Sequence, residues 1–274
     1  MQKENGYVAF LDVLGFRDML GRDDSLTEVQ NYIEGIRRAV EENGQKSLQL
    51  ALFSDSIIVN TTADDERSFL QLIEACSRIF GFLLTSHVPL RGAISYGPFI
   101  RSRNTGADSA IVAGRPIVEA FEREQKQDWV GITLAPSVVR HLSTLKEKTT
   151  LPTNNDMPER LKALRNRLPW LLYLHRYEHV PLHTGSPEEP GNVVGYAIVP
   201  VHGDVSNPVD WLRRMSELRD AADRMIELAP DGLSQRKCER LRTFIGAVHY
   251  SLAVSLSWDW YQQSAVKFDW VGTD

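Results

Sequence analysis

Hydrophobic and polar positions follow two different patterns at the start of the chain. Residues 7–14 are apolar except for Asp12, which is typical of a central strand covered on both faces. From residue 26 to 42, apolar side chains recur at spacings of three and four, which predicts an amphipathic helix ending at Asn43-Gly44. The chain is therefore expected to start with a strand followed by a helix.

The next fifty residues again contain strand patterns and a helix pattern. Residues 48–60 predict two short strands joined by a tight turn at Ser54-Asp55, and residues 65–86 carry one apolar helical stripe. Residues 90–99 predict a further strand, whose glycines indicate close backbone approach. The order βαββαβ predicts an α+β fold with a ferredoxin-like sheet and two helices on one side of it.

The remaining chain predicts an extension of this core. Its expected elements are a helix at 115–127, strands at 170–180 and 192–201, and long helices at 207–228 and 234–256. We divide the chain into a core at 1–144 and a C-terminal extension at 145–274, which continues the sheet, adds the two helices and packs on the core.

Composition narrows the possible partners. The 274 residues carry a formal net charge of −5, so the broad basic surface that nucleic acid requires is not expected. No apolar run approaches the roughly 20 residues of a membrane span, and the N-terminus lacks a signal-peptide pattern. We expect a soluble, cytoplasmic protein with no nucleic-acid or membrane partner, and a small anionic ligand remains compatible with this charge.

Two aspartates are the main candidates for chemistry. Asp12 lies inside an apolar strand, where an ionised carboxylate is costly unless a cation or several hydrogen-bond donors compensate it. Asp55 is at the tip of the predicted hairpin, which neighbours the first strand in a ferredoxin-like sheet. Two convergent carboxylates repel each other, and a pair of Mg²⁺ or Mn²⁺ ions would remove the repulsion while coordinating phosphate oxygens.

The loop after the first strand is a candidate phosphate site. Gly15, Phe16 and Arg17 follow the strand directly and lead toward a helix, so their backbone N–H groups are expected to face phosphates. The Arg17 side chain would add a charge-assisted hydrogen bond.

Three of these segments resemble the class III nucleotidyl cyclases. FLDVLGF at 10–16 is similar to the family's first strand, LFSDSII at 52–58 to its metal-binding hairpin, and RGAISYG at 91–97 to its fourth strand. The order and spacing also agree, and the resemblance covers roughly residues 7–125. It implies attack of the ribose 3′-hydroxyl on the α-phosphorus of a nucleoside triphosphate, with release of pyrophosphate.

The resemblance assigns roles to individual residues. It implies that Asp12 and Asp55 are catalytic and bind both metal ions, to which Val13 contributes its backbone carbonyl. The positions expected to contact the nucleotide are Gly15, Phe16, Arg17, Ala51, Phe53 and Arg91. Because the family forms its active sites between two catalytic domains, the resemblance also implies a homodimer with active sites at the interface.

The chain departs from the adenylyl cyclase pattern at two places. Ala51 stands where adenylyl cyclases carry an adenine-reading Lys, and Val118 and Glu122 stand where the family has its transition-state Asn and Arg. Candidates for a replacement arginine are left open among Arg91, Arg101, Arg103, Arg115 and Arg123.

Together with GRPIVEAFERE at 114–124, the motifs resemble the pyrimidine cyclases of the Pycsar anti-phage system. That resemblance implies a cyclase converting UTP to cyclic UMP, which acts on a separate effector. Three alternatives stay open: a cyclase for CTP or a purine triphosphate, a nucleotide sensor without catalysis, and a polymerase-like palm, which the acidic net charge disfavours.

Overall fold

The computed structural model describes residues 2–21, 25–41, 48–101, 112–145, 174–182, 191–201 and 208–265. Its strands are β1 Gln2–Val13, β2 Leu48–Phe53, β3 Ser56–Thr61, β4 Leu90–Arg101, β5 Val112–Gly114, β6 Gly131–Leu134, β7 Leu174–Leu182 and β8 Gly191–Ile198. Its helices are α1 Phe16–Leu20, α2 Ser25–Glu41, α3 Glu66–Thr85, α4 Arg115–Gln125, α5 Pro136–Thr144, α8 Pro208–Leu228 and α9 Gly232–Ala265.

One mixed sheet runs through the described part of the chain. Its strand order is β2-β3-β1-β4-β6-β8-β7, and β5 pairs with the end of β4. The first four strands are antiparallel neighbours, whereas β6 is parallel to β4. The order β2-β3-β1-β4, with helices between β1 and β2 and between β3 and β4, confirms the α+β fold and the ferredoxin-like core.

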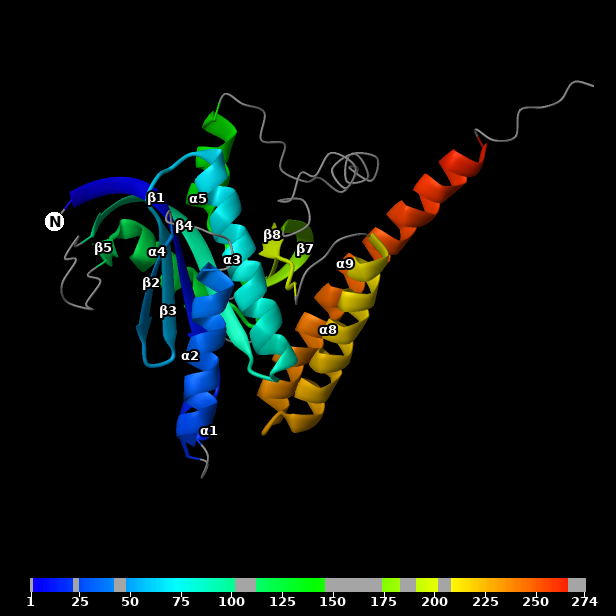
Figure 1. Ribbon diagram of the computed structural model, residues 1–274, viewed down its shortest axis with the longest axis horizontal. Coiled ribbons are helices and arrows are strands. Elements are labelled where there is room, and N and C mark those ends of the chain that lie inside the picture. The colour runs from blue at the N-terminus through cyan, green and yellow to red at the C-terminus, as the bar shows by residue number, and fades with distance from the viewer. Residues whose placement is uncertain are drawn as a thin grey trace, which may run out of the picture.

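Helices cover the two faces of this sheet unequally. Helices α2 and α3 lie over one face, where the rings of Tyr7 on β1 and Phe69 on α3 are 5.2 Å apart (Figure 1). On the opposite face α4 packs on β1 and β4, and Phe10 meets Phe121 edge-on at 5.4 Å. Alternate residues of β1 thus face two different environments, as the strand period requires.

Helix α3 forms the centre of the core. Its first turn is capped by Asp65, whose Oδ1 accepts a hydrogen bond from Ser68 N at 2.7 Å. Among the described helices, α3 is the one long and apolar enough to cross a membrane, with a mean hydropathy of 1.3 over a stretch that is 67% buried within the protein. Its apolar residues pack against the sheet and α8, as those of a core helix do.

The C-terminal elements continue the core. Strand β8 pairs with β6, β7 pairs with β8, and Val201 N donates to Ser77 O of α3 at 3.1 Å. Helices α8 and α9 pack against each other, α8 also contacts α3, and the far part of α9 projects away from the sheet (Figure 1). The predicted strands and long helices are confirmed, apart from residues 170–173, which lie outside the described residues. The division at residue 144 stays a prediction.

The structure corrects several predicted boundaries. β1 begins at Gln2 rather than residue 7, because its polar first residues pair with the far end of β4, Gln2 opposite Arg101. β5, β6, α1 and α5 were not predicted. They have three to nine residues each, and such short stretches are defined by their partners more than by their own periodicity.

Candidate active site

Asp12 lies next to the end of β1, between two neighbouring strands. It is opposite Ser56 of β3 and opposite Arg91 of β4. Residues directly opposite in antiparallel strands share a face, so Asp12 and Arg91 both point to the side of the sheet that α4 partly covers. The Asp12 side chain is 22% exposed, which leaves its carboxylate within reach of a ligand.

Asp55 is brought to the same end of β1 by the β2–β3 hairpin. Ser54 and Asp55 form the two-residue connection, in which Ser54 has a φ of 55°. A positive φ is what a tight connection between twisted strands demands. The carbonyl of Asp55 accepts a hydrogen bond from Val13 N at 3.0 Å. The structure therefore brings together the two carboxylate residues that the sequence singled out.

Arg91 and Glu124 complete the charged group. Arg91 Nε forms a short hydrogen-bonded ion pair with Glu124 Oε1, and its Nη1 donates to the carbonyl of Gln127 at 3.2 Å. Its Nη2 lies 4.0 Å from Asp12 Oδ2. Glu124 is fully buried at the C-terminal end of α4. Arg91 is therefore held inside the protein by α4 and lies beside Asp12.

The environment raises the pKa of Asp12 from 3.8 to about 6. Burial is the main cause, and the negative charges of Glu124 and Asp55 act in the same direction. The Arg91 guanidinium opposes them without cancelling them. The site therefore disfavours an ionised Asp12 as long as no cation joins it, and such a site attracts positive charge.

The donor set suits a hard divalent cation. Carboxylate and carbonyl oxygens are the ligands of Mg²⁺ and Mn²⁺, and Mg²⁺ commonly uses one or two carboxylates together with substrate phosphates. Asp12 and Asp55 supply that number, and Val13 follows Asp12 and donates its backbone N–H to the Asp55 carbonyl. Among the described residues, no three or more His, Cys, Asp or Glu side chains are arranged so that they could hold a metal ion by themselves.

The loop after β1 makes a sharp turn at Gly15, which has a φ of 75°. Leu14 N donates to Pro89 O at 2.9 Å, fixing the loop to the chain before β4. Phe16 buries its side chain against Tyr32 of α2, so any contact from Phe16 to a phosphate would come from its backbone. Arg17 is exposed on the five-residue α1. A phosphate-binding role for this loop stays a prediction.

Ala51 and Phe53 share the face of Asp12. Phe53 pairs with Ser56, which in turn pairs with Asp12, and Ala51 is connected in the same way through Ile58 to Phe10. Two strand spacings, about 10 Å, separate them from β1, a span suited to a nucleoside. Phe53 is 81% exposed. Their contact with a nucleotide stays a prediction, with the geometry leaving room for it.

The other arginines that were candidates for a transition-state role are spread out. Arg123 donates from Nε to Thr133 Oγ1 at 2.9 Å, and Arg115 is exposed at the start of α4. Arg103 lies outside the described residues, as does the side chain of Arg101. Val118 and Glu122, at the positions of the family's Asn and Arg, are exposed on α4.

Two residues near the site were missed by the sequence prediction. Glu124 falls on the buried stripe of α4, four residues after Ala120 and eight after Pro116, and this spacing was a usable signal for a buried carboxylate. Tyr32 buries a hydroxyl without a hydrogen-bond partner among the described residues, and its pKa is raised by burial and then by the charges of Asp55 and Asp12. Nothing in the sequence distinguishes Tyr32 from an ordinary core tyrosine.

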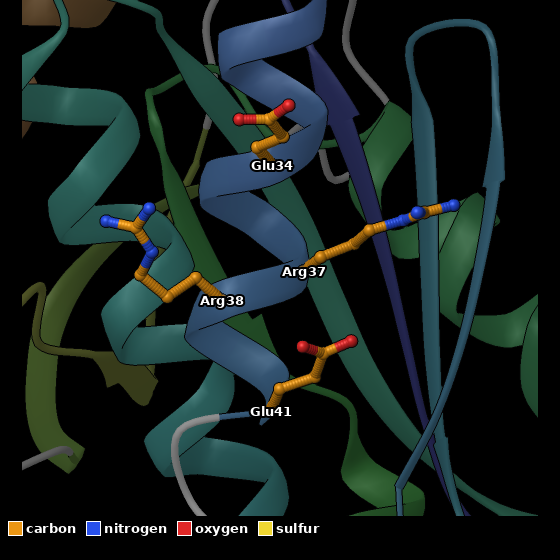
Figure 2. Close-up of a pocket in the computed structure, with 4 residues that line it drawn as sticks. All are labelled: Glu34, Arg37, Arg38 and Glu41. Atoms are coloured by element: carbon orange, nitrogen blue, oxygen red, sulfur yellow. The ribbon is translucent and has the colours of Figure 1, made fainter.

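A surface hollow of about 480 Å³ lies elsewhere, along α2. Figure 2 shows its lining residues Glu34, Arg37, Arg38 and Glu41, in which two basic residues lie between two acidic ones along the helix. Opposite charges at spacings of three and four compensate each other on a helix surface. This hollow does not include the two aspartates, and we assign it no part in the chemistry.

Comparisons with known proteins give similarity to solved structures, among them several cyclase domains. Neither a scan of protein-family models nor a search of curated proteins gave a match. The guanylate cyclase domain of RhGC from Catenaria anguillulae in complex with GTP is 11% identical, with a TM-score of 0.49, and the match covers 73% of this chain and 99% of that one. The adenylyl cyclase CyaB from P. aeruginosa is 14% identical, with a TM-score of 0.43 and coverages of 75% and 98%.

The dimeric guanylyl cyclase domain of the RhoGC fusion protein from Blastocladiella emersonii is 13% identical, with a TM-score of 0.45, covering 52% of this chain and 86% of that one. Similarity at these levels carries no argument about activity. The architecture rests instead on the strand order and register, which place the two aspartates at one end of a ferredoxin-like sheet.

Proposed function

We propose that the chain is a metal-dependent nucleotide cyclase that converts a nucleoside triphosphate to its 3′,5′-cyclic monophosphate and pyrophosphate. The observation that carries this function is the convergence of Asp12 and Asp55, which the Val13–Asp55 backbone hydrogen bond holds at the end of β1. The convergence occurs in the βαββαβ core that the hydrophobic pattern of the sequence predicted. A catalytically silent sensor would not need both carboxylates.

Different residues of the site would bind the metal ions, the phosphates and the nucleoside. Asp12 and Asp55 would hold two Mg²⁺ or Mn²⁺ ions, with the Val13 carbonyl as a further ligand. When bound, the ions neutralise the triphosphate and lower the pKa of the attacking ribose 3′-hydroxyl. The Gly15 turn would present backbone N–H groups to the phosphates, and the nucleoside would lie over Ala51 and Phe53, which share the face of Asp12.

An exposed apolar surface supports the homodimer. Phe53, Val118 and Phe121 are 81%, 54% and 45% exposed, and all three belong to the face on which Asp12 lies or to the helix that packs on it. Clustered exposed apolar residues are typical of interaction surfaces. A second copy of the chain placed here would cover them and enclose the site, as active sites at a dimer interface require.

Pyrimidine selectivity is the finer part of the proposal. Ala51 offers no side-chain group to read adenine, and the motifs resemble the pyrimidine cyclases, so UTP is the favoured substrate and CTP the next. The product, cyclic UMP, would act in the cytoplasm on a separate effector as part of an anti-phage response.

Incubation of the purified protein with each of the four nucleoside triphosphates and Mn²⁺, followed by chromatography, tests this function. Cyclic UMP as the main product supports the whole proposal. Exclusive formation of cyclic AMP or cyclic GMP would support cyclase activity and contradict pyrimidine selectivity. Template-dependent extension of a nucleic acid would replace the cyclase by a polymerase.

A further inference from the structure

Glu124 of α4 is a buried carboxylate that binds an arginine at the candidate metal site. We propose that Glu124 is a positioning residue, which holds Arg91 away from Asp12 and so keeps Asp12 available for a divalent cation. This role rests on the proposed function and adds to it a residue outside the predicted site.

Both carboxylate oxygens of Glu124 are engaged. Oε1 accepts from Arg91 Nε, and Oε2 accepts from Gln125 Nε2 at 2.7 Å. The residue is 0% exposed, and the Arg91 side chain is 12% exposed. A buried carboxylate with its lone pairs satisfied by an arginine is a stable arrangement, whereas either partner alone would be an uncompensated buried charge.

A second set of hydrogen bonds fixes the guanidinium. Arg91 Nη1 donates to the Gln127 carbonyl at 3.2 Å. The Gln127 side chain in turn donates to Gly92 O at 2.6 Å and accepts from Trp129 Nε1 at 3.0 Å. Gln127 and Trp129 are 1% and 0% exposed. Arg91 is therefore held by a rigid network that links the end of α4 to β4.

The contrast between the two carboxylates next to Arg91 defines the role of Glu124. Glu124 has a short hydrogen bond from Arg91, whereas Asp12 Oδ2 is 4.0 Å from Arg91 Nη2, which is too long for a hydrogen bond. Arg91 is thus hydrogen-bonded to Glu124, whereas it lies beside Asp12 without a hydrogen bond to it.

The charges lead to the same conclusion. The Arg91 cation and the Glu124 anion compensate each other, so Asp12 and Asp55 keep their negative charge for an incoming ion. Without the Glu124 charge, Asp12 would be the nearest anion left for Arg91, and a metal ion would have to displace that pair.

Equilibrium Mn²⁺ binding, followed by electron paramagnetic resonance in the presence of a non-cyclisable nucleoside triphosphate analogue, tests this role without depending on turnover. Glu124→Gln is expected to weaken Mn²⁺ binding about ten- to a hundredfold, as removal of groups that orient metal ligands does. Glu124→Asp keeps the charge and is expected to lose less. Glu122→Gln, an exposed neighbour on α4, is the matched control and should bind as the unchanged protein does.

The double variant Arg91→Gln/Glu124→Gln distinguishes repositioning of Arg91 from general damage. It removes the competing cation together with its partner. Because Arg91 is itself expected to contact the nucleotide, the double variant is compared without nucleotide, where its Mn²⁺ affinity should return to that of the unchanged protein. An affinity of Glu124→Gln equal to that of the unchanged protein, or a double variant as weak as the single one, would overturn the role. If circular dichroism shows that Glu124→Gln does not fold, the Mn²⁺ affinities of the double variant and of Glu124→Asp test the role instead.

Failure of the inference and failure of the function give different results. An unchanged protein that binds Mn²⁺ no better than Asp12→Asn contradicts the metal site and with it the proposed function. Binding that is lost in Asp12→Asn but unaffected by Glu124→Gln overturns only the role of Glu124.

Discussion

Asp12 on β1 faces Arg91 on β4 across one strand pair, with Oδ2 of the aspartate 4.0 Å from Nη2 of the arginine. The arginine is bound to Glu124 and does not form a close pair with Asp12. Asp12 is thus partly buried, surrounded by other carboxylates and incompletely neutralised. This unfavourable electrostatic environment is what a cation-binding site needs, and it leads to the first two predictions.

Asp12→Asn is expected to abolish cyclic nucleotide formation while stabilising the metal-free protein. The Asp12 pKa is about 6 in the folded state, against an ordinary value of 3.8, so the folded state binds the proton more tightly than the unfolded chain does. Asp12 therefore lowers stability as pH rises from about 4 to 6, and the full penalty is present at pH 8. At pH 8 the substitution should raise the free energy of unfolding by about 1–3 kcal/mol in urea titrations. A less stable variant would contradict the environment described for Asp12.

Mn²⁺ binding should weaken in acid. A proton on Asp12 competes with the metal ion, and with a pKa of about 6 this competition begins near pH 6. Below that pH the affinity should fall by up to about tenfold per pH unit. Electron paramagnetic resonance titrations between pH 5 and 8, with nucleotide-only samples subtracted, measure this. An affinity independent of pH over that range would show that Asp12 is not a ligand.

Charge on the exposed apolar face should separate the subunits. Phe53→Glu and Val118→Glu each place a carboxylate on the surface proposed to contact the second copy, and both are expected to give monomers without activity. Leu26→Glu is the matched control, since Leu26 is 81% exposed on α2, which covers the opposite face of the sheet. Analytical ultracentrifugation measures the mass. Monomeric unchanged protein with full activity would contradict the interface.

The cap of α3 should contribute to stability and not to chemistry. Asp65→Ala removes the acceptor for Ser68 N and is expected to lower the free energy of unfolding by about 1 kcal/mol. Asp65→Asn keeps a capping oxygen and should cost less. Urea unfolding of the three proteins compares them, and equal stability of all three would show that the cap is dispensable.

Much of the core could be predicted because its periodicity is local. The apolar run around Asp12, the hairpin at Asp55 and the stripe of α3 are each defined by neighbouring residues. The register of β1 was not accessible in this way, since its polar start at Gln2 is a strand only because β4 is long enough to pair with it. Whether such a segment forms a strand depends on its neighbours in the sheet rather than on its own composition.

The candidate site also contains some residues that could be predicted from the sequence and others that could not. Asp12 and Asp55 stand out because a carboxylate in an apolar strand and one at a hairpin tip are visible in sequence. The Arg91–Glu124 pair joins residues 33 positions apart, and its role follows only from how α4 packs on β4. The sequence pointed to the two aspartates, whereas the buried ion pair beside them could be found only from the fold.

The most direct test compares pyrophosphate and cyclic nucleotide formed by the unchanged protein, Asp12→Asn and Asp55→Asn, with Mn²⁺ and each of the four nucleoside triphosphates. The predicted result is equimolar pyrophosphate and cyclic product from the unchanged protein, with UTP the preferred substrate, and neither product from the two variants. Absence of a cyclic product with all four triphosphates, or variants as active as the unchanged protein, would contradict a cyclase built on these two aspartates.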